Sequence, residues 1–306
     1  MPQISTALKL LWTTPHYVFG RFHGVRTTYS NARRVRQLFR PPAALAIGER
    51  YETYTEPLLV RPSGLLESTR SPAEHVARLE RDAYSDGLQM SAEACAQLIE
   101  HAKRQPLGVA GGVISYAQLL QDAAKRDDVA LATVTDVARN EVIRSLSADP
   151  LLLEVVEGYL GYRPERVSPW LFWSPKNRLS DAEREARYQT VRFHYDVHHY
   201  NFMYVNFYLM DTTERTGAHM LILGSHRDKR ARHAAPVASA PVAEDHRGLT
   251  RCICVGQAAR GRRFARHWIE AGHAQFVDAA GALFELVGAR CDLRQTTHEA
   301  APFGTC

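Results

Sequence analysis

The segment Phe193–Lys229 reads FHYDVHHYNFMYVNFYLMDTTERTGAHMLILGSHRDK, and it decides the fold. Its alternating apolar and polar residues predict three consecutive strands, at Thr190–Val197, Phe202–Met210 and Ala218–Leu223. Asp211–Gly217 is a polar turn between the second and third strands. We therefore expect a β core in which strands that follow one another along the chain lie close together.

The first of these strands carries the triplet His194-Tyr195-Asp196. Residues two apart in a strand point to the same face, so His194 and Asp196 can converge on one cation while Tyr195 faces away. Imidazole and carboxylate are suitable donors for Fe(II), and a triad of two His and one carboxylate leaves coordination sites open. An isolated triplet of this kind is weak, and His226-Arg227-Asp228 is a second example. The alternative interpretation is a surface or hydrogen-bonded histidine that binds no metal.

Upstream of the strands, helical patterns dominate. Ser71 can cap a helix over Pro72–Ala83, and Ser91 opens another with Ala94, Leu98 and Ile99 on one face. Asp149-Pro150 followed by Gly161 predicts the start and stop of a further helix, Leu151–Leu160. Two more helices are predicted at Tyr116–Ala124 and Val134–Leu146.

The order of these elements predicts the fold class and the domains. Ser168–Ser174, with Trp170 and Trp173, is aromatic-rich and strand-like. Helices followed by sequential strands favour an α+β fold around an antiparallel core. We expect residues 1–70 to be an irregular N-terminal extension with strand-like pieces in Glu49–Val60, and residues 71–306 to form the main domain.

Composition places the chain among ordinary globular proteins. It has 306 residues, of which 45% are hydrophobic and 23% charged. No apolar run reaches the roughly 18–20 residues of a membrane helix, so we expect a cytoplasmic protein. The odd number of cysteines, five, argues against a disulfide framework. Cys252-x-Cys254 with Cys291 could suggest zinc, but C-x-C is not the usual ligand spacing, which favours free thiols.

Charge adds little about partners. The net charge is +5, and the segment Arg227–Cys306 has 12 Lys/Arg against 8 Asp/Glu, a surplus of four. These basic residues lack interleaved aromatics, so we expect no nucleic-acid partner. We expect a small-molecule substrate and no membrane partner.

The segment Phe193–Lys229 resembles the phytanoyl-CoA dioxygenase family. In that family an H-x-D motif is followed by a strand with an acidic turn, matched here by Tyr204–Asp211. Next come a turn that Thr213–His219 matches, a strand, and a G-S-H-[RK] segment, matched by Gly224–Arg227. The Asp149–Gly161 helix and the Trp170–Trp173 strand also fit. The resemblance is good over about residues 145–229 and weaker back to about residue 75, and the tail 230–306 is atypical.

The resemblance implies a double-stranded β-helix, or jelly roll, in which two sheets enclose a metal. It implies Fe(II) as cofactor and 2-oxoglutarate as cosubstrate, with hydroxylation of a C–H bond in an unidentified small or lipid-like substrate. By motif position, His194 and Asp196 would be metal ligands, while His226 would have a structural role.

The resemblance breaks where a distal His and an Arg for the far carboxylate of 2-oxoglutarate are required. His298 is the candidate for the third ligand, because its setting T-T-H-E-A-A-P is similar to that of the family's distal His. Glu285 is a second candidate, and a chain without a functional third ligand is the alternative. Lys176 and Asn206 are the candidates for cosubstrate contacts, and Asn201 could also hydrogen-bond a cosubstrate.

One hypothesis about the tail explains why the distal His and the Arg cannot be placed. No Tyr, Met, Lys or Asn occurs after Lys229, as expected of a shifted reading frame or a replaced C-terminus, and the jelly roll would then be incomplete. A second hypothesis for function follows, namely a catalytically inactive dioxygenase-like protein. A third is a non-enzymatic binding module, whose pocket would be lined by the aromatic side chains of Tyr195, Tyr200, Phe202 and Tyr204.

Overall fold

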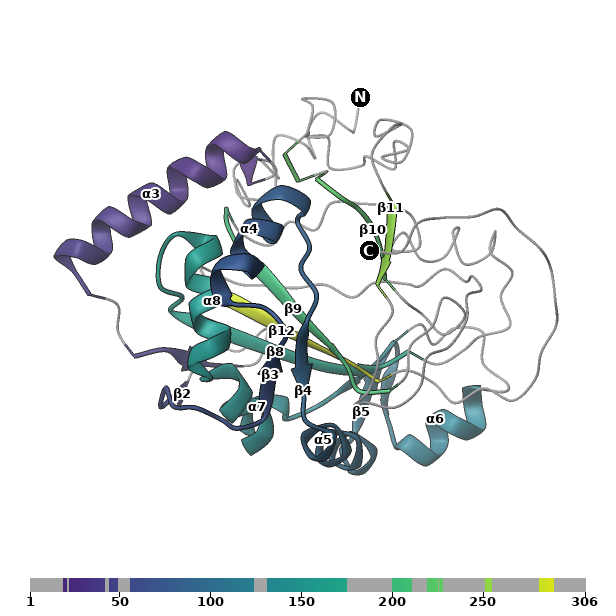
Figure 1. Cartoon of the computed structure of the whole chain (residues 1–306). Helices are drawn as coiled ribbons and strands as arrows, with labels where there is room; N and C mark the ends of the chain where they lie inside the picture. Colours follow the sequence, from purple (N-terminus) through teal and green to yellow (C-terminus); the bar gives the residue numbers. More distant parts are fainter. Residues whose placement is uncertain are drawn as a thin grey trace, which may run out of the picture.

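The computed structural model describes residues 19–20, 22–41, 44–48, 56–123, 131–174, 200–210, 219–224, 226–227, 251–254 and 281–288. These residues form a mixed α+β fold in which helices surround a curled sheet (Figure 1). Within the described part of the chain, no helix has both the length and the apolar content that crossing a bilayer demands.

The helices with strong local start signals are confirmed. Ser71 forms a full capping box with Glu74 at the start of α4 (Pro72–Asp82), and the Ser91 side chain caps α5 (Ala92–Arg104). Helix α6 spans Tyr116–Ala123. In α8 (Pro150–Leu160) the Asp149 carboxylate accepts the Leu151 N–H at 2.9 Å, and Gly161 ends the helix with φ 77°. Such a left-handed end suits glycine because it has no Cβ.

The single helix predicted at Val134–Leu146 is wrong. Its first residue belongs to a strand, β7 (Ala132–Val134), and a 3₁₀ turn, η1, follows at Val137–Arg139. Asn140 then caps a new helix, α7 (Glu141–Ser147), by accepting the N–H groups of Val142 and Ile143. A side chain that caps a helix start competes with an uninterrupted helix, which explains the break.

Residues 23–39 lie in the segment expected to be irregular, yet they form a helix, α3 (His23–Phe39). None of its residues is buried, and it contacts the rest of the protein through polar side chains and through Tyr29, which packs against the main core. A helix held by polar contacts lacks the apolar stripe that sequence patterns detect. The same N-terminal segment also contributes two short strands, β1 (Ala46–Ile47) and β2 (Glu56–Pro57), to the main sheet.

Eight of the described strands form one sheet. Its long central strand is β8 (Arg166–Trp173), which pairs with β1 and β7 along one edge and with β12 (Gly281–Gly288) along the other. β9 (Met203–Tyr208) follows β12. The sheet is completed by β5 (Leu107–Val109), next to β7, and β6 (Gly112–Ile114). Two smaller pairs are β3–β4 (Leu66–Ser68 with Leu88–Met90) and β10–β11 (His219–Ile222 with Arg251–Cys254).

The expected antiparallel core is only partly correct. Strands β9 and β10 match the predicted second and third strands, but they do not pair with each other. Instead, β9 runs parallel to β12, and β12 runs parallel to β8, while β10 is antiparallel to β11. Alternation in sequence predicts that a segment is a strand, but pairing with residues some 80 positions away leaves no local pattern.

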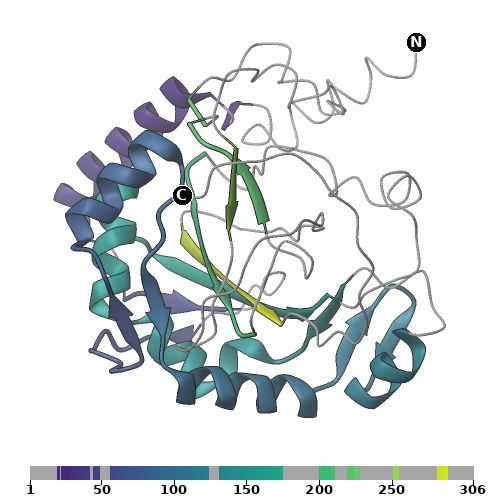
Figure 2. The same cartoon turned by 45° about the vertical axis from the view of Figure 1, so that its right-hand side comes forward.

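The sheet curls into a half-barrel (Figure 2). Helices α3, α4, α8 and α5 lie on its outer side, and the β10–β11 pair lies across from its inner face (Figures 1 and 2). The main core fills the space between helices and sheet. It includes Leu152 and Val156 of α8, Leu98 of α5 and Leu171 of β8, which are all essentially inaccessible to solvent.

A buried histidine connects α4 to the neighbouring strand and loop. His75 is 1% exposed, and its Nε2 and Nδ1 atoms each lie 2.8 Å from a serine hydroxyl, on Ser68 and Ser85 respectively. Burial, followed by the positive charge of Arg70, lowers the pKa of His75 from 6.5. The fold therefore favours the neutral imidazole.

This histidine makes the fold sensitive to acid. Because the folded-state pKa lies below 6.5, the unfolded chain binds the extra proton more readily, so stability is complete above about pH 6.5 and falls below it. In urea unfolding at about pH 7.5 and about pH 5.5, we expect the advantage of the wild type over His75→Gln to shrink at the lower pH. A difference in unfolding free energy that is unchanged between the two pH values would contradict this assignment.

The inner face of the half-barrel as a candidate functional site

Strand β8 is buried on both faces, and its two faces have different roles. Val167, Leu171 and Trp173 join the main core beneath the helices. The alternate residues Trp170 and Phe172 form a separate cluster on the inner face, in which Leu131 and Tyr208 pack against them. The inner face therefore has an aromatic cluster of its own.

Strand β9 repeats this division. Met203, Val205 and Phe207 are buried in the main core, so the alternate residues Tyr204, Asn206 and Tyr208 lie on the inner face. Of the six residues of β9, Asn206 alone is exposed. The residue predicted to contact a cosubstrate is thus placed on the inner face with its amide accessible.

The register of β12 connects the two strands. Glu285 is paired with Trp170 of β8 on one side and with Asn206 of β9 on the other. One level along, Val287 is paired with Phe172 and Tyr208. The backbone therefore brings Glu285, the second candidate for a third metal ligand, to the same level of the sheet as Asn206.

The aromatic groups of the inner face are held in defined contacts. The Trp170 and Phe172 rings lie 4.8 Å apart, and the Trp170 Nε1–H donates to Thr133 Oγ1 at 3.3 Å. Phe202 and Tyr204 meet edge to face at 5.3 Å. By alternation Ser168 shares this face, and its buried hydroxyl has no hydrogen-bond partner among the described residues. Burying such a group without a partner lowers the free energy of unfolding by about 1–3 kcal/mol. Groups of this kind occur in strained regions and also in binding sites, where a ligand supplies the missing partner.

The other predicted site residues, Lys176, His194, Asp196 and His298, lie outside the described residues. Lys176 follows the end of β8 by three positions, and the His194–Asp196 pair lies in the segment that links β8 to β9. Among the described residues, no three His, Cys, Asp or Glu side chains come close enough together to hold a metal ion.

His226 has the structural role expected for it. It is buried, and its Nε2 lies 3.1 Å from the Glu80 carbonyl oxygen in α4. Its own carbonyl accepts a hydrogen bond of 2.8 Å from Arg26 in α3, and the Gly224 N–H donates to the Asp82 carbonyl. Gly224 and His226 of the G-S-H-R segment thus connect α3 and α4. The histidine of this second H-x-D triplet is therefore occupied by structural contacts.

Asn201, which the sequence also suggests as a hydrogen-bonding partner of a cosubstrate, makes structural contacts instead. It is buried, and its Nδ2 donates to Ser30 Oγ at 2.8 Å and to the Leu160 carbonyl at 3.4 Å. Its backbone carbonyl accepts from the Tyr162 hydroxyl at 3.4 Å, and burial of Tyr162 raises the pKa of that phenol. Asn201 thus ties the chain entering β9 to α3 and to the end of α8.

Sequence patterns missed the inner-face role of Trp170 and Phe172. The two faces of a strand are distinguished in sequence by alternating apolar and polar residues. This alternation is missing in β8, because seven of its eight residues are buried. Among the aromatic residues proposed to line a pocket, Tyr204 and Phe202 contact each other, whereas Tyr200 stacks on Tyr29 of α3 at 5.3 Å. Tyr195 lies outside the described residues.

Comparisons with known proteins add no relative: no protein-family model matches the chain, and no curated protein or solved structure is significantly similar to it.

The contrast between Asn201, which is buried and structural, and Asn206, which is exposed on the inner face, can be tested by mutation. We expect Asn201→Ala to lower the free energy of unfolding by about 1–3 kcal/mol, because it leaves buried groups without partners. Asn206→Ala, at an exposed position, is expected to change it by about 0.5 kcal/mol or less. Urea unfolding followed by circular dichroism measures both. If Asn206→Ala proves the more destabilising of the two, the assignment of the structural role to Asn201 is wrong.

Proposed function

We propose that this protein is an Fe(II)- and 2-oxoglutarate-dependent oxygenase similar to the phytanoyl-CoA dioxygenase family, which hydroxylates a small or lipid-like substrate. The observation that carries the proposal is the order of motifs in Phe193–Lys229, with His194-x-Asp196 ahead of β9 and G-S-H-R after β10. The cytoplasmic location and the absence of membrane and nucleic-acid partners belong to the same proposal.

The fold class is compatible with a jelly roll, and the jelly roll itself is part of the proposal. The half-barrel has helices on its outer side and the β10–β11 pair across from its inner face (Figure 2). A double-stranded β-helix has its reactive centre between two such sheets. We infer that the inner face, with its aromatic cluster and accessible amide, is the wall of the reaction site.

The donor set fits the metal in chemical type. An imidazole from His194 and a carboxylate from Asp196 are ligands that suit Fe(II). His298 is the proposed third ligand, with Glu285 as the second candidate. When bound, the Fe(II) and 2-oxoglutarate would supply the oxidising chemistry, while the chain would hold and orient the reactants and exclude water.

The remaining roles belong to the chain's own residues. Lys176 and Asn206 are proposed to contact the cosubstrate, Lys176 by its charge and Asn206 by hydrogen bonding from the inner face. The rings of Trp170 and Phe172 would exclude water from the same wall. A dry environment strengthens the electrostatic contacts that orient a charged cosubstrate.

A metal-independent binding module is the second candidate, and the aromatic cluster of the inner face favours it. Such a module would bind an apolar ligand against the inner face without iron. An inactive dioxygenase-like protein that has lost the distal His and the Arg is a related alternative, and both are separated from an active oxygenase by metal and cosubstrate binding.

The proposal is tested by metal binding. Under anaerobic conditions, purified protein with Fe(II) and 2-oxoglutarate should show a visible charge-transfer band and about one iron per chain by elemental analysis. His194→Ala and Asp196→Ala should lose both signals. His23→Ala, which removes an exposed histidine of α3, is the matched control and should keep them. Wild-type protein that binds neither iron nor 2-oxoglutarate would exclude the active oxygenase.

Asn206→Ala tests the inner face within the same assay. Loss of one hydrogen bond of about 1 kcal/mol should weaken 2-oxoglutarate binding about fivefold, with the iron content unchanged. A titration of the charge-transfer band measures this affinity. If the variant binds the cosubstrate as tightly as the wild type, Asn206 has no role in its recognition.

A further inference from the structure

Helix α3 docks onto the protein through its polar face. Arg26 donates to the His226 carbonyl, Ser30 accepts from Asn201, and Arg33 pairs with Glu165 at 2.5 Å. Gln37 then makes a reciprocal pair with the backbone of Arg163, donating to its carbonyl at 2.9 Å and accepting from its N–H at 3.0 Å. These docking residues recur at intervals of four, three and four, which places them on one face of the helix.

The C-terminal part of α3 presents apolar groups to solvent. Val35 is 53% exposed, Leu38 75% and Phe39 82%. The exposed arginines Arg34, Arg36 and Arg40 lie between and beside them, and none has an ion-pair partner in the described part of the chain. This arrangement is the reverse of an ordinary surface helix, in which the apolar residues face the protein.

This helix lies in a strongly basic part of the chain. Residues 1–48 contain seven Lys or Arg and no Asp or Glu. Their surplus of seven exceeds the surplus of four in Arg227–Cys306, so the N-terminal part of the sequence, which contains α3, carries a net positive charge of its own. An acidic partner would be attracted to this end of the molecule.

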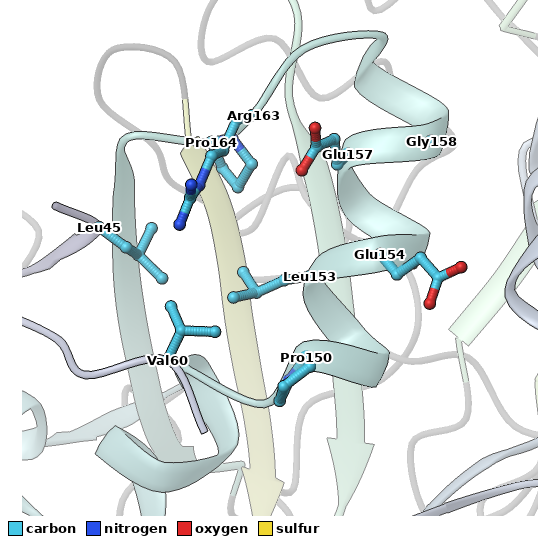
Figure 3. Close-up of a pocket in the computed structure, with 9 residues that line it drawn as sticks. All are labelled: Leu45, Val60, Pro150, Leu153, Glu154, Glu157, Gly158, Arg163 and Pro164. Atoms are coloured by element: carbon cyan, nitrogen blue, oxygen red, sulfur yellow. The ribbon is translucent and has the colours of Figure 1, made fainter. Parts of the chain in front are cut away.

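A cavity of about 430 Å³ has Arg163 in its wall, and the backbone of Arg163 is hydrogen-bonded to Gln37 near the end of α3. Its wall is largely apolar, from Leu45, Val60, Pro150, Leu153 and Pro164, and it is completed by Glu154, Glu157, Gly158 and Arg163. Figure 3 shows Leu45, Val60 and Leu153 pointing toward a common space, with the Arg163 side chain extending above Leu45 and Glu154 pointing away. The Gln37–Arg163 pair fixes this rim to α3.

We propose that the end of α3 and this cavity form one docking surface for an acidic, amphipathic segment of a partner protein. The partner inserts a large apolar side chain between Leu45 and Leu153, and its neighbouring apolar residues cover Leu38 and Phe39. Aromatic and arginine groups of this kind dominate the binding energy of protein interfaces.

The geometry also orients the partner. Arg34, Arg36 and Arg40 attract acidic residues on the α3 side, whereas Glu154 and Glu157 of α8 disfavour them on the far rim. The acidic residues of the partner therefore lie on one side of its apolar anchor. A lipid surface also attracts basic and apolar groups, but it makes no use of a cavity, and for this reason the observations favour a polypeptide.

The test uses a display library of random twelve-residue peptides, panned against the full-length protein. Enriched peptides should combine a large apolar residue with Asp or Glu. We expect their affinity to fall about tenfold or more with Leu38→Ser/Phe39→Ser, with Arg34→Glu/Arg36→Glu and with Leu153→Trp, which fills the cavity. Leu120→Ser, which replaces a 58% exposed leucine of α6, is the matched control and should bind normally.

Three outcomes would overturn the proposal. These are no enrichment over the Leu38→Ser/Phe39→Ser variant, enriched peptides without acidic residues, and affinity that Leu153→Trp leaves unchanged. Sedimentation with vesicles of phosphatidylcholine and phosphatidylserine that is likewise insensitive to Leu153→Trp would assign the surface to lipid instead. The His194→Ala variant should bind the peptides normally, so this proposal and the oxygenase proposal can fail separately.

Discussion

The burial of β8 on both faces is the constraint on which the rest of the structure depends. A strand with no solvated face must be covered by two layers, and each layer then has its own composition. On the outer side, Leu171 and Trp173 pack into the aliphatic core that α8 and α5 complete. On the inner side, Trp170 and Phe172 form an aromatic cluster. The half-barrel follows from this division, because helices occupy one side and leave the other for a second layer.

The inner face gains its chemical character from strands that are distant in sequence. Pairing through β12 brings Trp170 and Asn206 to one level of the sheet, although 36 positions separate them in the chain. The main core holds the opposite faces of β8 and β9 in place, and Asn201 fixes the entry to β9 against α3 and α8. Stability and the proposed chemistry therefore depend on different residues of the same strands, as Asn201 and Asn206 illustrate.

Local signals explain which parts of this fold could be predicted from the sequence. Ser71, Asp149 and Gly161 act on the backbone within a few residues, so the helices that they start or end were predicted correctly. Helix α3 was missed because polar groups dock it, and the break at Asn140 was missed because a cap inside an apolar pattern is hard to distinguish from a helical residue. The pairing of β9 with β12 depends on long-range contacts that no local pattern contains.

The residues of the candidate site also differ in how far the sequence alone could place them. The cosubstrate contact predicted for Asn206 from its place in a strand stays a prediction, although the structure locates this residue on the inner face. The pairing of Glu285 with Asn206 could be found only from the sheet register. The central claim, that His194 and Asp196 bind iron at this inner face, is tested most directly by anomalous diffraction at the iron edge from anaerobic crystals of the protein loaded with Fe(II) and 2-oxoglutarate. We expect one iron peak, contacted by both side chains, on the same side of the sheet as Trp170 and Asn206. Iron bound elsewhere, or the two side chains pointing apart, would contradict it.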